Sequence, residues 1–227
     1  MLTSTPLGYD DLPPLLTALT GDEKHDWSAL STLDVLWVLY DRVLRVDPRA
    51  PGDPDRDRFL LSKGHGPAAY YAVLAAKGFV DVDRLAGFGT FDSPLGYHPD
   101  RLLVPGVEIS SGSLGHGLPI ALGTTLGLEA RGRVRARVFC LVGDAELDEG
   151  SNWEAVQIAG RLGLGRLTVV VVDNASSTYH WPGGIDARFA LEGWSAERVD
   201  GRDHAALERA LGATGERPNV VVAEVER

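Results

Sequence analysis

The sequence predicts an α/β protein with a doubly wound, mostly parallel sheet flanked by helices. Two short runs, 134–142 and 167–172, are rich in β-branched residues and have no polar face, which is typical of strands covered on both sides. The segment between them, 149–162, repeats apolar residues at helical spacing. A strand, a helix and a second strand in this order predict the repeating unit of a parallel sheet.

The flanking segments extend this pattern in both directions. Residues 1–24 are rich in Pro, Thr and Asp and are predicted to form an arm outside the core, followed by one domain at 25–227. Ser31 or Thr32 can cap a first helix, and Gly78 can end a second. We expect helices at 31–46, 68–77, 114–129, 186–192 and 205–211, strands at 195–199 and 219–225, and irregular chain at 47–57 and 87–113.

The composition excludes several classes of protein. Lys and Arg number 22 against 32 Asp and Glu, a formal charge of −10, which excludes a general nucleic-acid binder because polyanion affinity needs a basic face. A hydrophobic fraction of 44% argues against a disordered chain. The single cysteine, Cys140, cannot form an intramolecular disulfide and is expected to be a small buried hydrophobe. Without signal-peptide character or a long apolar run, the sequence predicts a cytoplasmic protein.

Polar residues follow both predicted central strands. Asp144 comes directly after the first strand, and Asn174 comes after the second. Ligands bind at the carboxyl ends of strands in open α/β sheets, and carboxylate and amide oxygens suit Mg²⁺. The helix that begins near Glu149 directs free backbone N–H groups to the same place, which favours a diphosphate. The sequence therefore predicts a site for Mg²⁺ and a diphosphate.

Several motifs resemble one known family. Gly143-Asp144-Ala145 and the later Asn174 resemble the thiamine diphosphate signature, which begins Gly-Asp-Gly and ends in Asn. The segments 57–66, 97–99 and 105–117 resemble, in the same order, the N-terminal half of transketolase. Further matches are Gly150, Glu154, Gly193-Trp194 and Val199-Asp200-Gly201. The resemblance covers 25–227 and implies the thiamine diphosphate-binding fold known as the PP domain.

The resemblance implies a set of cofactor-binding residues. Asp144, Asn174 and the carbonyl oxygen of Ser176 would hold Mg²⁺. Gly143 and Ala145 would lie at the diphosphate, where alanine in place of the usual glycine is tolerated at negative φ. The backbone of Gly112, Ser113 and Leu114 would approach the aminopyrimidine, and His65 would lie near the diphosphate and the reacting centre.

The resemblance also implies catalytic residues. His25 and His98 would flank the substrate channel, where imidazole exchanges protons with sugar hydroxyls. Glu149 and Glu154 match acidic positions that relay protons near the subunit interface, although both also suit a solvated helix face. Other residues have less specific readings: His116 suits a structural polar contact, and His180 and Trp181 suit either the mouth of the site or a partner surface.

In this family the glutamate that activates the aminopyrimidine comes from a second, pyrimidine-binding domain. This implies a split, transketolase-like enzyme that transfers a two-carbon ketol unit from a ketose to an aldose. It would act with a separate pyrimidine-domain subunit, and a heterotetramer is the family expectation. Two alternatives stay open: the α subunit of a 2-oxoacid-decarboxylating thiamine diphosphate enzyme, and a catalytically degenerate subunit that only binds a partner.

Overall fold

A parallel β-sheet forms the centre of the molecule in the computed structural model, which describes residues 7–19, 30–64, 67–179 and 181–225. Its five strands are ordered β1-β2-β3-β5-β4 across the sheet, and every neighbouring pair is parallel. The strands are β1 (Arg58–Leu61), β2 (Val138–Gly143), β3 (Leu167–Asp173), β4 (Ser195–Asp200) and β5 (Asn219–Glu224).

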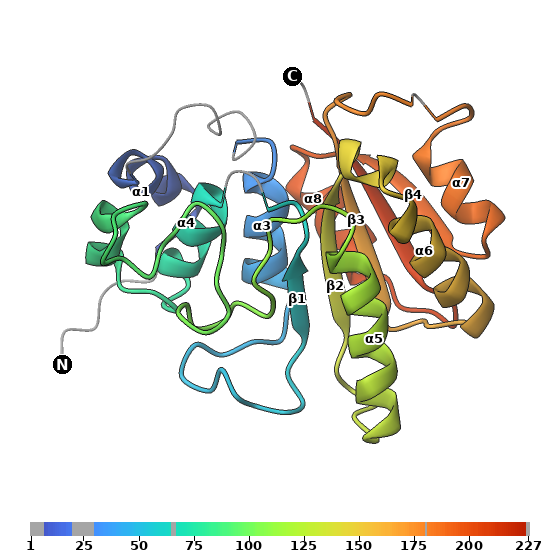
Figure 1. Cartoon of the computed structure of the whole chain (residues 1–227), viewed down its shortest axis with the longest axis horizontal. Helices are drawn as coiled ribbons and strands as arrows, with labels where there is room; N and C mark the ends of the chain where they lie inside the picture. The colour runs from blue at the N-terminus through green and yellow to red at the C-terminus, as the bar shows by residue number, and fades with distance from the viewer. Residues whose placement is uncertain (1–6, 20–29, 65–66, 180, 226–227) are drawn as a thin grey trace.

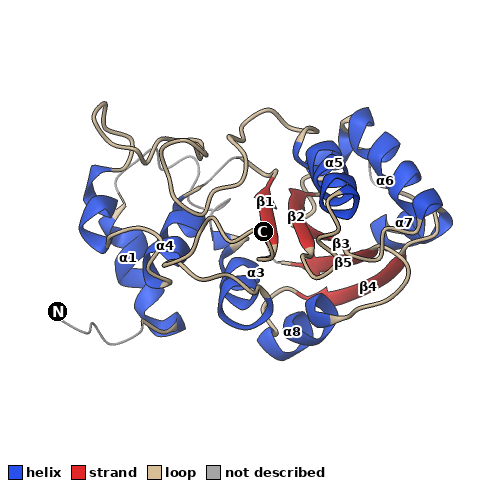
Figure 2. Cartoon of the chain, turned by 90° about the horizontal axis from the view of Figure 1, so that it is seen from below, coloured by secondary structure: helices blue, strands red, loops and turns tan. Residues whose placement is uncertain are grey.

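Helices cover both faces of the sheet, as Figure 2 shows. One face carries α5 (Gly117–Ala130), α6 (Gly150–Leu162) and α7 (Ile185–Leu191). The other carries α3 (Leu33–Val38), which continues into a π-helical turn, η3 (Leu39–Val43), together with α8 (His204–Gly212). Beyond β1 lie α1 (Leu12–Ala18) and α4 (Ala68–Ala76), and the short 3-10 helices are η1 (Tyr9–Asp11), η4 (Val82–Gly87) and η5 (Ala145–Asp148). The predicted doubly wound fold is therefore confirmed.

Alternation along the central strands explains the two layers. In β2, Phe139 and Leu141 pack into the core on the α3 side, whereas Val138, Cys140 and Val142 pack into the core on the α5 side. Successive side chains of a strand point to opposite faces, so a strand between two helix layers needs apolar residues at every position. All six residues of β2 are buried, as the uninterrupted run of apolar residues predicts.

The structure differs from the predicted elements near the N-terminus. Within the segment predicted as an arm, Leu12 and Leu15 of α1 are buried in the core beside α4, so at least this part is a core element. The strand β1 was not predicted, because four residues inside a loop-like motif are too few to show a period. The predicted first helix ends at Val43 rather than at residue 46.

Two boundaries were wrong in the middle of the chain. The helix expected from residue 114 begins at Gly117, because 112–116 form an irregular loop. The strand expected from residue 134 begins at Val138, because residues 134 and 135 form a turn before it. No helix among the described residues is both long enough and apolar enough to cross a membrane.

Candidate active site at the carboxyl edge of the sheet

The parallel strands β2 and β3 end at the same edge of the sheet (Figure 1), and Asp144 directly follows β2 there. The Asp144 carboxylate holds the loop that follows β3. The backbone N–H groups of Ser176 and Ser177 donate to Asp144 Oδ2 at 2.5 and 2.8 Å. The Ser176 hydroxyl donates to Oδ1 at 2.6 Å. Asp144 is only 2% exposed, so water competes little for these hydrogen bonds. They therefore hold the end of β2 against the loop that follows β3.

A second carboxylate holds the same loop. Asp148 accepts hydrogen bonds from the Ser177 hydroxyl at 2.8 Å and from the Thr178 N–H and hydroxyl at 3.1 and 2.8 Å. The loop reaches both carboxylates through a turn at Ala175, whose φ of +55° is the one positive value at a non-glycine among the described residues. Backbone held in such a sparsely populated region is typical of functional loops.

The oxygen atoms at Asp144 are of the kind that Mg²⁺ takes as ligands together with phosphate oxygens. An ionised carboxylate offers about four lone pairs, and three are occupied by the donors of Ser176 and Ser177. Among the described residues, Oδ1 accepts a hydrogen bond from the Ser176 hydroxyl alone, and the half-buried Asn174 lies in the loop that Asp144 holds. Within the described ranges, no group of three His, Cys, Asp or Glu side chains is arranged so that it could hold a metal ion. A Mg²⁺ ion bound at Asp144 would take its other ligands from phosphate oxygens and water.

The loops predicted to meet the cofactor lie against one another. A Cβ at Gly64 would lie 2.6 Å from the backbone nitrogen of Gly112, so these two loops touch through their main chains. Gly112 has a φ of +152°, and a Cβ there would lie 2.9 Å from Cδ2 of His98. The half-buried Gly112 and the exposed Ser113 and His98 are thus placed together at one surface that a ligand can reach.

One buried polar atom in these loops is of the kind that a bound ligand completes with a hydrogen bond. The Ser111 hydroxyl oxygen is buried and has no hydrogen-bond partner within the described residues. A buried hydroxyl without a partner costs free energy, so such atoms are uncommon unless a water or ligand completes them. Ser111 directly precedes Gly112, where the aminopyrimidine is expected.

Glu146 connects three loops of the site and was not singled out from the sequence. Its carboxylate accepts hydrogen bonds from the Ser62 hydroxyl, from the Gly115 N–H at 3.0 Å and from the Gly143 N–H at 3.3 Å. The Ser62 oxygen in turn accepts from the Gly117 N–H at 3.0 Å. Burial raises the pKa of the Glu146 carboxyl, although the hydrogen bonds oppose the shift.

Lys63 places a positive charge beside the same edge. Its side-chain carbons lie 3.4–3.6 Å from the position that a Cβ would take at Gly143, and its Nζ donates to the Ser31 hydroxyl at 2.8 Å. Burial lowers the pKa of Lys63 to about 8, against the attraction of Asp144 and Glu146, which raises it. The carboxyl edge of the sheet thus carries the Lys63 ammonium and the Asp144 carboxylate where the diphosphate is expected.

Several predicted site residues lie outside the described residues or have roles that stay predictions. His25, His65 and His180 are outside the described ranges, so their placement stays a prediction. Glu149 is the exposed residue directly before α6, and its Cβ would lie 2.7 Å from a Cβ placed on Gly115. Glu154 is exposed on α6, and the proton-relay role of both glutamates stays a prediction.

Three other residues have clear structural contacts. His116 is exposed, with its Nδ1 at 3.0 Å from the Leu114 carbonyl oxygen, which suits a structural polar contact. The Trp181 ring packs edge-on against Trp153, with 5.2 Å between the ring centroids, and Arg188 stacks over both rings. Cys140 is fully buried in β2, as predicted, and burial raises the pKa of its thiol.

The residues that sequence reasoning missed hold the site together without standing at a strand end. Glu146 and Asp148 lie among the acidic residues after Asp144, in a segment where solvated side chains are the ordinary expectation. A signal was available in their number, because Asp144, Glu146, Asp148 and Glu149 fall within six residues that follow an apolar strand. Which of them turn inward depends on the 3-10 helix η5, and no pattern predicted that helix.

Comparison with known proteins identifies consistent similarities. Residues 19–224 match the family model described as transketolase, thiamine diphosphate binding domain. The chain is 38% identical to an apulose-4-phosphate transketolase subunit of Actinobacillus succinogenes, over 72% of this chain and 63% of that protein. It also resembles the solved transketolase of Leishmania mexicana, with a TM-score of 0.78 and 25% identity, over 97% of this chain and 37% of that one.

A further relative carries an unrelated name. The chain is 54% identical to the protein named ferredoxin fas2 of Rhodococcoides fascians, over 98% of this chain and 74% of that protein. Iron–sulfur clusters are held by several cysteine thiolates, and this chain contains only Cys140. The given sequence therefore offers one thiolate, fewer than such a cluster requires.

Proposed function

The chain belongs to the transketolase family, and from this premise we propose that it supplies the diphosphate-binding half of a split active site that transfers a two-carbon ketol unit from a ketose to an aldose. The observation that carries the proposal is that Asp144 binds the backbone of Ser176 and Ser177 through hydrogen bonds. The loops at Gly64 and Gly112 also contact each other through their main chains. The chain spans little more than a third of the solved transketolase, so the reaction of a whole enzyme is part of the proposal.

Each part of the site has a proposed task. Asp144, Asn174 and the Ser176 carbonyl would hold Mg²⁺ against the diphosphate, and Lys63 would balance its charge. The main chain at Gly112 would lie against the aminopyrimidine, with His98 beside it to exchange protons with substrate hydroxyls. Bound thiamine diphosphate would supply the carbon nucleophile for the ketose carbonyl, a capacity that no protein side chain has.

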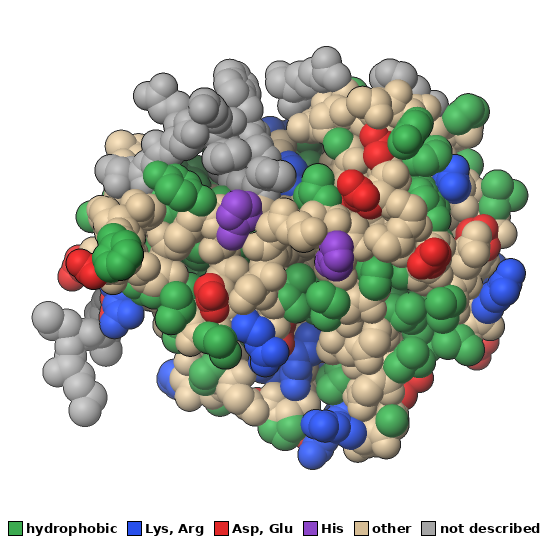
Figure 3. Space-filling model, viewed as in Figure 1, with side chains coloured by type: hydrophobic (Ala, Val, Ile, Leu, Met, Phe, Trp, Pro, Cys, Tyr) green, Lys and Arg blue, Asp and Glu red, His purple; other side chains and the backbone are tan. Residues whose placement is uncertain are grey.

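We propose that a pyrimidine-domain subunit completes the site, in a heterotetramer. The relative from Actinobacillus succinogenes is named as one subunit of its enzyme, which supports a partner, and so does the exposed apolar surface over α5 and α6, on the right of Figure 3. Large exposed hydrophobic side chains on these helices are Ile120, Leu126, Ile158 and Leu162. Exposed apolar patches of this kind mark protein interfaces. A cytoplasmic location remains part of the proposal.

The test mixes the purified chain with a separately produced pyrimidine-domain subunit. Ketose cleavage and 2-oxoacid decarboxylation are assayed with thiamine diphosphate and Mg²⁺, using the wild type, Asp144→Asn and the exposed control Asp83→Asn. We expect ketose cleavage by the mixture only, lost in Asp144→Asn and retained in the control. Turnover by this chain alone would overturn the partner requirement. Reaction with the oxoacid alone would identify the decarboxylating alternative, and absent Mg²⁺-dependent cofactor binding in the complex would indicate a degenerate subunit.

A further inference from the structure

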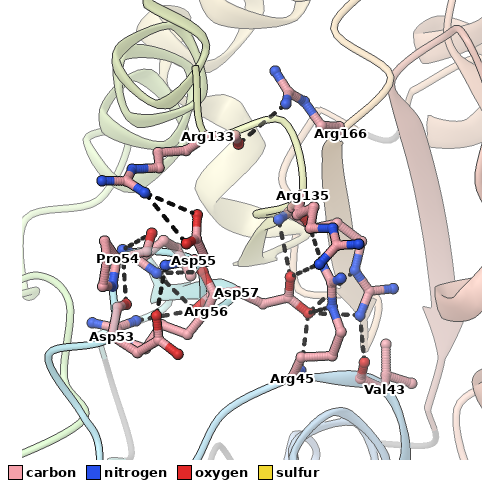
Figure 4. Close-up of polar contacts among 12 residues, drawn as sticks. Val43, Arg45, Asp53, Pro54, Asp55, Arg56, Asp57, Arg133, Arg135 and Arg166 are labelled. Atoms are coloured by element: carbon pink, nitrogen blue, oxygen red, sulfur yellow. Dashed lines mark hydrogen bonds and ion pairs between the residues drawn. The ribbon is translucent and has the colours of Figure 1, made fainter. Parts of the chain in front are cut away.

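A pocket rich in arginine lies at the N-terminal edge of the sheet, opposite the edge that carries Asp144. It is an open pocket of about 450 Å³, and the lining that matters here is Arg45, Arg135, Arg137 and Arg166, with Val134 and Thr214. Its residues directly precede β2 and β3 or lie in the connections before β1 and β5, and Figure 4 shows this region. We call it the arginine pocket.

Three of the guanidinium groups are held in place. Arg45 and Arg137 form ion pairs with Asp57 at 2.7 and 2.6 Å, and Arg166 pairs with Glu129 at 2.7 Å. Arg137 also donates to the Val43 carbonyl at 2.5 Å. Because these side chains are already ordered, a ligand would lose little free energy in fixing them.

Neither of the two paired carboxylates lines the arginine pocket, although the Glu129 side chain is 38% exposed. Asp57 is fully buried. Four guanidinium groups therefore meet two carboxylates, which leaves an excess of two positive charges in a chain whose formal charge is −10. The nearby Arg133 is paired with Asp55 at 3.3 Å and does not change this excess.

The positive charge of Arg135 takes part in no ion pair among the described residues. Arg135 is exposed in the pocket wall. Its backbone carbonyl accepts a hydrogen bond from Arg45, which fixes the main chain at this position. A side chain anchored at its base and unpaired at its tip can turn toward an anion.

We propose that the arginine pocket binds the phosphate group of a small molecule. Planar guanidinium groups recognise phosphate through paired N–H donors, and the lining presents only cations, the Thr214 hydroxyl and apolar side chains. The pocket is open and shallow, and its volume is in the range of small-molecule sites, which suits a phosphate group bound near the surface. The formal charge of −10 disfavours an extended polyanion as the ligand. A ligand here would not compete with one bound at the opposite edge of the sheet.

The test titrates inorganic phosphate and glycerol 3-phosphate into the full chain by isothermal calorimetry. The titrations are run without Mg²⁺, which the proposed diphosphate site at the carboxyl edge requires, so that binding there does not contribute. Under these conditions we compare the wild type with Arg135→Ala, and with Arg161→Ala as a control for the loss of one exposed arginine on α6. We expect Arg135→Ala to weaken binding about tenfold, the loss of one charged hydrogen bond, and Arg161→Ala to leave it unchanged.

Every outcome bears on the proposal. Tighter binding of glycerol 3-phosphate than of inorganic phosphate identifies a phosphate ester as the ligand class, and equal or tighter binding of inorganic phosphate identifies free phosphate. Both results support the pocket when Arg135→Ala weakens the binding. Equal binding by Arg135→Ala, or no binding by either probe up to about 10 mM, overturns it. Binding of a glutamate-rich peptide when neither phosphate binds also overturns it, in favour of a protein partner. Failure here leaves the proposed ketol transfer untouched, because the two sites lie at opposite edges.

Discussion

Glu146 offers the sharpest test of how the site is assembled. The side chain is 1% exposed and accepts hydrogen bonds from Ser62, Gly115 and Gly143, so three loops depend on one carboxylate. Glu146→Ala leaves two buried backbone N–H groups and one buried hydroxyl without an acceptor. At about 1–3 kcal/mol for each buried unsatisfied group, with partial relief from water, we expect a loss of about 3–5 kcal/mol in the free energy of unfolding.

Glu146→Gln separates the acceptor from the shape of the side chain. Its amide oxygen can still accept from Ser62 and Gly115, but its NH₂ group faces the Gly143 N–H, so we expect a loss of about 1–2 kcal/mol. Urea denaturation at neutral pH measures both variants, with Glu154→Gln on the exposed face of α6 as the control, expected within about 0.5 kcal/mol of the wild type. Wild-type stability in Glu146→Ala would refute the reasoning, because the three loops would then not depend on this carboxylate.

Three further perturbations probe the loops and the charge network. Gly112→Ala places a Cβ 2.9 Å from His98 at a φ of +152°, so we expect a loss of about 1–3 kcal/mol by thermal unfolding and weaker cofactor binding; an unchanged melting temperature would contradict this. Asp148→Ala frees the loop after β3, and we expect about tenfold weaker Mg²⁺-dependent cofactor binding by calorimetry, with equal binding counting against a role for that anchor. Burial would raise the pKa of Asp57, but hydrogen bonds from Arg45 and Arg137 hold this pKa below its usual value. The ionised Asp57 therefore stabilises the folded protein above about pH 4, and this contribution is lost as the pH falls through the folded-state pKa. The stability advantage of the wild type over Asp57→Asn should therefore be larger at pH 7 than at about pH 3 in denaturant titrations, and a pH-independent difference would exclude the linkage.

The positions of the site residues differ in how far the sequence predicted them. Asp144 was predictable because it follows a fully apolar strand, and such a strand ends at the edge where ligands bind. The glycines at 64 and 112 were predictable only as a motif, since their contact joins loops that are far apart in the chain. Glu146 and Asp148 could not be distinguished from solvated acidic residues, because their burial depends on which loops pack over η5.

The sequence by itself determined the layered architecture and the edge at which the cofactor is expected. Both follow from local patterns: apolar runs make buried strands, and the residue after each run must emerge at the carboxyl edge. Only the tertiary structure decided that Leu12 and Leu15 join the core, that Glu146 binds three loops, and that four arginines converge opposite the site. These features depend on contacts between segments distant in the chain, and a one-dimensional pattern carries no information about which distant residues meet.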